Sequence, residues 1–188
     1  AENVFSMIGR QLGDGMARKK DVDVLALYSG FSTDIGAAGR SMSLANVSAA
    51  VAYAKGKKFG SNVYIVQHPF ALWDIANTAV TASSTYPVPA GWSADLLGNF
   101  FSGLRPINGV PIFEDGNISI DSSDDAVGVI ADRSALGVLK SVDMNKEQDR
   151  DISLRATEVV ITADYGVFEL DDSKGVALTL DAGTPATS

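Results

Sequence analysis

The feature that most constrains the fold is a long strand-like stretch near the C-terminal end, at residues 152–170. Apolar and polar residues alternate strictly over 152–157, and over 158–163 the apolar phase shifts by one residue. Alternation with a period of two predicts a β-strand, and the shift predicts either a bulge or a segment covered on both faces. A charged loop over 144–151 is expected to precede this strand.

A second strand is expected to follow the long one. Residues 171–175 have the composition of a turn, and residues 176–180 return to an apolar run. The resulting arm is longer than one small domain needs to close its own core, and it carries Arg155 and Glu158 along its middle. Such an arm suits a surface shared between subunits. An ordinary hairpin within a single α+β domain is the alternative.

The N-terminal stretch, residues 2–27, has the pattern of a long amphipathic helix, with apolar residues at four-residue steps: Val4, Ile8 and Leu12. Gly9, Gly13 and Gly15 each weaken such a helix by about 1 kcal/mol relative to alanine. Packing within the subunit or between subunits must offset that cost, and small residues let another backbone approach. A break near Gly13 is the alternative.

A second helix is predicted after a Gly-, Ser- and Ala-rich connection at 29–43. Ser43 is a suitable N-cap, and the helix carries one apolar face: Leu44, Val47, Val51 and Ala54. A basic group lies near its C-terminal end, where the helix dipole favours cations: Lys55, Lys57 and Lys58. This placement explains the basic group without a ligand.

The middle of the chain predicts a small sheet. Residues 62–67 are apolar on both faces and indicate a central strand, whereas Pro111 within 107–113 indicates an edge strand. Residues 126–131 predict another buried strand. A short helix is expected from Pro69 onward, and a long surface loop is expected at 78–93, with Trp92 as an anchor.

Composition excludes several classes of function. The chain has 188 residues, no cysteine and a single histidine, His68, so it lacks disulfides, thiolate nucleophiles and zinc sites of the usual kind. No cofactor-binding or catalytic pattern is present, and His68 at a strand end predicts a cap or a packed side chain. A formal net charge of −8 disfavours nucleic-acid binding through a basic field. Without a signal peptide or an apolar run near the roughly 18 residues of a membrane span, a soluble protein with no membrane partner is expected.

Five segments, in this order, resemble the major capsid proteins of tailed phages, which have the Hong Kong 97-type fold. They are Lys19-Lys20-Asp21 at the end of the first helix, Ser43-Leu44 at the start of the second, Val63-Tyr64-Ile65-Val66-Gln67-His68-Pro69, Ile107-Asn108-Gly109-Val110-Pro111-Ile112-Phe113, and Arg155-Ala156-Thr157-Glu158 through Tyr165-Gly166-Val167. The resemblance covers most of the chain.

The resemblance implies an α+β fold with a long spine helix, a peripheral domain with long β-strands and an inserted axial domain. The implied boundaries are 1–42 and 141–188 for the two parts of the peripheral domain and 43–140 for the axial domain. Family members usually have an N-terminal arm and an extended β-hairpin before the spine helix. This sequence begins at or just before that helix, so neither segment is expected in it.

The function implied by the resemblance is structural: a non-enzymatic subunit that self-assembles into pentamers and hexamers of an icosahedral phage head. The head would enclose double-stranded DNA without sequence-specific binding. Scaffold, portal or decoration proteins are the further partners implied, and the virion, assembled in the host cytoplasm, is the implied location. A bacterial nanocompartment shell of the encapsulin type uses the same fold and is the close alternative.

The residues expected at contacts between subunits lie in three places: Gly9, Arg10 and Gly13 on the spine helix, Arg155 and Glu158 on the long strand, and Trp92 in the loop. A distant alternative is a small α+β enzyme or ligand-binding domain that uses acids such as Asp74, Asp95 or Glu114. No sequence pattern pairs those carboxylates, and solvated surface acids are the commoner explanation.

Overall fold

The structure is a computed structural model that describes residues 2–80 and 109–185. Its order is α1 (Glu2–Leu25), a 3₁₀ turn η1 (Ala26–Gly30), α2 (Leu44–Gly56), β1 (Val63–Gln67), α3 (Pro69–Val80), β2 (Ile112–Glu114), β3 (Asp125–Asp132), β4 (Leu136–Asp151), β5 (Ala156–Glu169), a 3₁₀ turn η2 (Asp172–Lys174) and β6 (Gly175–Asp181). The predicted α+β class is therefore confirmed.

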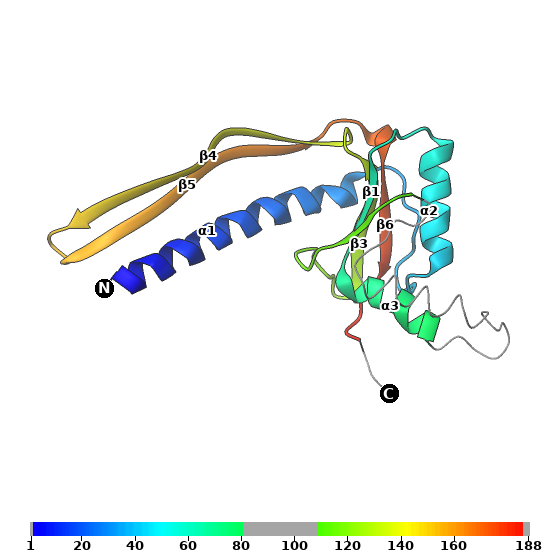
Figure 1. Cartoon of the computed structure of the whole chain (residues 1–188), viewed down its shortest axis with the longest axis horizontal. Helices are drawn as coiled ribbons and strands as arrows, with labels where there is room; N and C mark the ends of the chain where they lie inside the picture. Colours follow the sequence, from blue (N-terminus) through cyan, green and yellow to red (C-terminus); the bar gives the residue numbers. More distant parts are fainter. Residues whose placement is uncertain (1, 81–108, 186–188) are drawn as a thin grey trace.

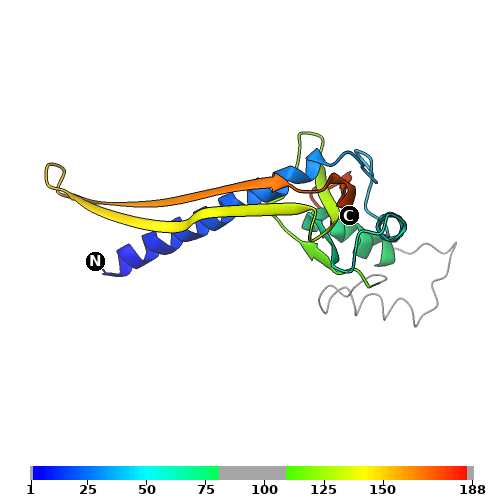
Figure 2. The ribbon, with the colours of Figure 1, turned by 90° about the horizontal axis from the view of Figure 1, so that it is seen from above.

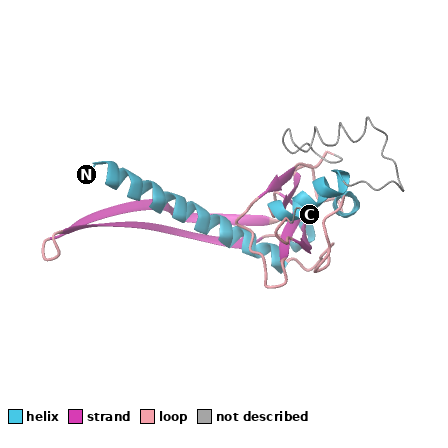
Figure 3. Cartoon of the chain, turned by 90° about the horizontal axis from the view of Figure 1, so that it is seen from below, coloured by secondary structure: helices cyan, strands magenta, loops and turns pink. Residues whose placement is uncertain are grey.

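The molecule has two parts, which we call the body and the extension (Figure 1). The body is a four-stranded sheet in the order β2-β1-β3-β6, with α2 along one face and α3 at one end. The extension consists of α1 and the hairpin β4–β5, which project from the body in the same direction (Figure 2). Helix and strands lie side by side in this extension, also when viewed from below (Figure 3).

The body contains the hydrophobic core. β1 pairs with β2 in parallel and with β3 in antiparallel, and β3 pairs with β6 in antiparallel. The side chains that fill this core come from both sheet and helices: Ile65, Val129, Ile130, Leu178 and Leu180 from the strands, Val47 and Val51 from α2, and Leu72 and Ile75 from α3. The connection after α1 also contributes, because Tyr28, Phe31 and Met42 are buried.

Local sequence signals explain most of the body. The hydroxyl of Ser43 accepts a hydrogen bond from the Asn46 amide at 3.3 Å, as expected for an N-cap. β1 lies between β2 and β3, and β2 lies at the sheet edge, where Pro111 costs no ladder hydrogen bond. His68 is buried, and its Nδ1 accepts from the Phe70 amide at 3.1 Å, so it caps the start of α3.

Three expectations about the C-terminal third are wrong. Residues 144–151 form the second half of β4 rather than a charged loop, and residues 152–155 form the hairpin turn rather than a strand. β6 does not pair with the long strand before it; it pairs with β3 and completes the sheet of the body. The expected boundary at residue 141 thus assigns β6 to the peripheral domain although its hydrogen bonds are made in the body. The domain boundaries themselves stay a prediction.

Helix α1 is continuous over 24 residues and spans about 36 Å at a rise of about 1.5 Å per residue. The alternative of a break near Gly13 is wrong. Gly9 and Gly13 are half-buried, and a Cβ added at either would meet nothing within 4 Å. The glycines therefore do not serve close packing within this subunit.

Candidate assembly surface

The tip of the hairpin is a tight turn closed by one carboxylate. Oδ1 of Asp151 accepts hydrogen bonds from the Ser153 amide at 2.8 Å, the Ser153 hydroxyl at 2.6 Å and the Leu154 amide at 3.1 Å. Arg155 completes the turn with a φ of 51°. An aspartate that accepts from the backbone two and three residues onward is a common turn device. It leaves Ile152 and Leu154 84% and 75% exposed.

Helix α1 contacts the hairpin through a polar cluster near the middle of the extension. Nζ of Lys20 donates to both the carbonyl oxygen and Oδ1 of Asp143 at 2.6 Å, and it lies 5.6 Å from the centre of the Tyr165 ring. The Tyr165 hydroxyl donates to Oδ2 of Asp23 at 2.6 Å. We call these four residues the Lys20 cluster. It joins α1 to β4 and to β5.

Electrostatics within this cluster favour the ionised carboxylates. The hydrogen bond from Lys20 is the largest cause that lowers the pKa of Asp143. Lys140 lowers this pKa further, because its Nζ lies 3.3 Å from Oδ1 of Asp143. The pKa of Asp23 is lowered mainly by its hydrogen bond with Lys19 and then by that from Tyr165. Both carboxylates therefore stay charged at neutral pH.

Lys20 contacts β4 where the strand ladder is irregular. The register shifts between Lys140 and Val142 and again between Val142 and Asn145, so this part of β4 contains two bulges. A bulge leaves backbone groups without a ladder partner. The Asp143 carbonyl lies within the second shift and accepts a hydrogen bond from Lys20.

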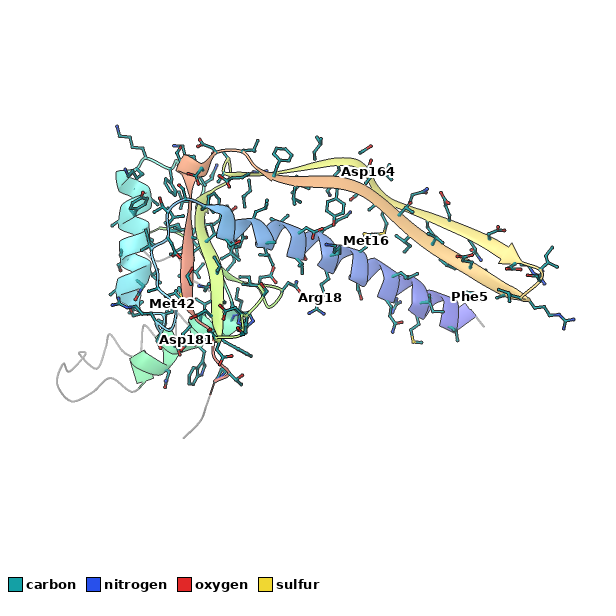
Figure 4. All side chains as sticks on the ribbon, turned by 180° about the vertical axis from the view of Figure 1, so that it is seen from behind. Phe5, Met16, Arg18, Met42, Asp164 and Asp181 are labelled. Atoms are coloured by element: carbon teal, nitrogen blue, oxygen red, sulfur yellow. The ribbon has the colours of Figure 1, made fainter. Side chains whose placement is uncertain are left out.

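The extension exposes much apolar surface that belongs to no core. The large apolar side chains exposed on it are Val4, Phe5, Met7, Ile8, Leu12 and Val22 on α1, and Val138, Leu139, Val142, Met144, Ile152, Leu154, Val160 and Phe168 on the hairpin and its turn. Elsewhere in the described residues, only Leu44, Phe113 and Leu170 are comparably exposed. In Figure 4, Met16 lies between α1 and the hairpin, and Arg18 lies on the opposite side of the helix. Soluble monomers rarely expose extensive apolar patches, so this surface fits an interface.

Five of the six residues expected at contacts between subunits lie on the extension. Gly9, Arg10 and Gly13 are on α1, Arg155 is in the tip turn, and Glu158 is near the distal end of β5. Trp92 lies outside the described residues. Whether these residues contact another subunit stays a prediction.

Sequence reasoning missed the residues that shape this surface. It did not identify the Lys20 cluster, which joins positions far apart in the chain, or Asp151 as the residue that closes the tip. The one available signal was the alternation of charge along 146–150, Lys-Glu-Gln-Asp-Arg, which has the two-residue period of an exposed strand.

The acids proposed for an enzyme are not brought together. Asp74 is half-buried on α3, and burial is the largest cause that raises its pKa, whereas Glu114 is exposed at the edge of the sheet. Asp95 lies outside the described residues. Within the described ranges, no three acidic or histidine side chains are grouped to hold a metal ion, and no helix there is long and apolar enough to cross a membrane.

Comparison with known proteins places the fold. No family model matches the sequence, and a search of curated proteins finds no match either. Among solved structures, a chain of Mycobacterium phage Che8 aligns with a TM-score of 0.73 at 14% identity, over 91% of this chain and 61% of that chain.

Two further structures show the range of shells with this architecture. The capsid of cyanophage P-SCSP1u aligns with a TM-score of 0.62 at 14% identity, over 95% of this chain and 66% of that chain. The encapsulin complex of Synechococcus elongatus aligns with a TM-score of 0.62 at 10% identity, over 95% of this chain and 66% of that chain. The chain thus spans less than two thirds of these proteins' lengths. The similarity confirms the predicted fold: this chain has the phage capsid-type fold.

Proposed function

We propose that this protein is the shell-forming subunit of a phage head, a major capsid protein that assembles into pentamers and hexamers of an icosahedral capsid. The observation that carries the proposal is the extension, which exposes apolar side chains along its whole length. An isolated two-stranded hairpin is at best marginally stable in water. Contacts with neighbouring copies would stabilise it and cover its apolar surface.

The two parts of the molecule suit the two domains of such a subunit. We assign the extension, with α1 as the spine helix, to the peripheral domain, and the body to the axial domain inserted at 43–140. β6 completes the sheet of the body although it follows the hairpin in sequence. The hairpin is connected directly to this sheet, because β5 leads into β6 through the short turn η2.

Assembly of this kind needs no catalytic group, and we propose that the protein is not an enzyme. Burial of apolar surface contributes roughly 25 cal/mol per Å², and heterologous contacts between identical subunits close into rings. The net charge of −8 suits a wall that encloses double-stranded DNA without binding its sequence. Scaffold, portal and decoration proteins are the further partners of such a shell, with the virion as its location after assembly in the host cytoplasm.

The test is the state of the full-length gene product in solution. We expect closed particles, or rings of five and six, in sedimentation velocity and negative-stain electron microscopy. The tip variant Ile152→Asp with Leu154→Asp should lower the assembled fraction and leave the fold unchanged, because both side chains are exposed. Leu44→Asp is the matched control, since Leu44 is exposed on the body at a helix start that tolerates an acid. A parent protein that stays monomeric at every concentration and salt would refute the proposal.

An encapsulin-like nanocompartment shell is the second candidate, and the similarity to the encapsulin of Synechococcus elongatus favours it. Purified particles decide between the two, because a phage head encloses DNA and a nanocompartment encloses protein. A monomer that binds a small molecule saturably would instead favour the enzyme or ligand-binding alternative.

A further inference from the structure

The strand register separates the charges of the hairpin onto its two faces. Tyr165 donates to Asp23 on α1, so the face of β5 that includes Tyr165 points toward the helix. The opposite face, which we call the outer face, carries only acidic charge along β4 and β5, both of which are described in full. Its acids are Glu147, Asp149, Asp151, Glu158 and Asp164, and Figure 4 shows Asp164 on the side away from α1. Lys146 pairs with Ile161 and Arg150 pairs with Thr157 in the register, so both basic residues lie on the face toward α1.

The outer face is not stabilised by ion pairs of its own. Asp149 lies directly opposite Glu158 in the register, and like charges at such positions destabilise a pair of strands. Within the described residues, neither Asp149 nor Glu158 takes part in the ion pairs that Lys19, Lys20 and Lys140 form. An isolated subunit therefore gains nothing from this arrangement.

A basic cluster lies on the body, next to the root of the hairpin. Nζ of Lys174 donates to the Lys58 carbonyl at 2.7 Å, which places η2 beside the end of α2. The Arg133 amide donates to the Asn62 carbonyl at 3.3 Å, which places the end of β3 beside the same segment. The cluster comprises Lys57, Lys58, Arg133 and Lys174. One acid lies beside it, Asp132, and the charge of Lys174 is among the causes that lower the pKa of Asp132. The dipole of α2 accounts for Lys55 in its last turn, but Arg133 directly follows β3 and Lys174 ends η2.

The acidic face cannot reach the basic cluster of its own chain. Asp149 is 13 residues beyond the start of β4 at Leu136, a distance of about 40 Å along a strand that rises about 3.3 Å per residue. Charges interact in physiological salt over a Debye length of about 8 Å. Any benefit from the complementarity therefore requires a second molecule.

We propose that the outer face of the hairpin binds the basic cluster of a second copy of this chain, in a head-to-tail contact. This inference rests on the proposed function. The two surfaces are complementary in charge, they lie on different parts of the subunit, and the acidic face cannot reach the basic cluster of its own chain. A contact between different surfaces of identical subunits is heterologous and can close into a ring. Charged groups at such a contact mainly set register and association rate.

Charge reversal on each surface tests the contact. The acidic-face variant is Glu147→Lys, Asp149→Lys and Glu158→Lys, and the basic-cluster variant is Lys57→Glu, Lys58→Glu and Arg133→Glu. We expect each to lower the association constant at least about tenfold in sedimentation experiments on the full-length product in ~0.15 M salt. The two variants combined should recover most of it. The matched control reverses exposed acids elsewhere, Asp14→Lys, Asp21→Lys and Glu114→Lys, and should not rescue the basic-cluster variant.

The outcomes separate the contact from the function. An acidic-face variant that assembles like the parent would show that these charges only keep exposed strand edges apart, and it would overturn the proposal. Failure of the combined variant to recover, with an unfolding midpoint equal to that of the parent, would overturn it too. If a variant unfolds, the association rate of the parent protein is measured at increasing salt concentration instead. We expect that rate to fall as salt rises, and an unchanged rate would contradict the contact. A parent that never assembles would refute both this contact and the proposed function.

Discussion

Gly128 on β3 is predicted to tolerate no side chain, because the side chain of Gln67 lies directly over it. Gln67 is fully buried; its Nε2 donates to the Leu178 carbonyl on β6 at 3.0 Å, and its Oε1 accepts from the His68 amide at 2.9 Å. The amide thus spans from β1 to β6 over the strand between them. A Cβ at Gly128 would lie 2.5 Å from Oε1 of Gln67 and 2.5 Å from the Val66 carbonyl oxygen.

The expected cost of Gly128→Ala has two parts. Overpacking in a buried region costs about 1 to 3 kcal/mol. Displacing the Gln67 amide leaves buried polar groups without a partner, which costs about 1 to 3 kcal/mol more. We therefore expect the free energy of unfolding to fall by about 4 kcal/mol. At about 2 to 4 °C per kcal/mol for a chain of this size, the melting temperature should fall by about 8 to 16 °C.

Urea unfolding, followed by the fluorescence of Trp73 on α3, measures this change. Gly116→Ala is the matched control, because Gly116 is exposed and an added Cβ meets nothing within 4 Å. Gln67→Ala should be destabilising alone, yet less destabilising in the Gly128→Ala background, because the displaced amide is already absent. The reasoning is refuted if Gly128→Ala lies within about 0.5 kcal/mol of the parent, the range of neutral surface changes, or if the two changes are additive.

Further predictions concern single contacts. Ser43→Ala should lower the free energy of unfolding by about 1 kcal/mol in the same assay, because it removes the N-cap hydrogen bond to Asn46. Tyr165→Phe removes the hydroxyl that donates to Asp23 at 2.6 Å, so amide hydrogen exchange should become faster in β5 and stay unchanged in β1. Burial raises the pKa of Asp74, so the folded chain binds this proton more tightly than the unfolded chain, and stability falls as pH rises above about 4. Asp74→Asn should remove that part of the pH dependence, measured as urea midpoints between about pH 4 and pH 7.

The body was predictable because its signals are local. Ser43 marks the start of α2, Pro111 marks an edge strand, and residues 62–67, apolar on both faces, mark a central strand. Each of these depends on a property of one residue, such as a capping hydroxyl or a missing backbone N–H, or on burial on both sides of a strand. The structure confirms all three.

The hairpin was only partly predictable because β4 is exposed on both faces over most of its length. Every residue of β4 from Lys140 to Arg150 is exposed, so no apolar period marks it as a strand. At the tip, the apolar residues Ile152 and Leu154 alternate with polar ones, as they would in a strand. The Asp151 carboxylate nevertheless closes a turn there. The pairing of β6 with β3 joins positions far apart in the chain, which a local pattern does not encode. The same holds for the contact between Lys20 and Asp143.

The two bulges of β4 determine which charges face α1. β4 has 16 residues and β5 has 14, and the two extra residues of β4 are accommodated between Lys140 and Asn145. Before the bulges, Lys140 pairs with Tyr165 on the helix side; after the first, Val142 pairs with Asp164 on the outer face. The second bulge restores the original phase. A single bulge would instead turn Lys146 outward and the acids of β4 toward the helix, because a one-residue shift exchanges the two faces of a strand. The irregular segment that Lys20 contacts is therefore also the segment that keeps the outer face acidic.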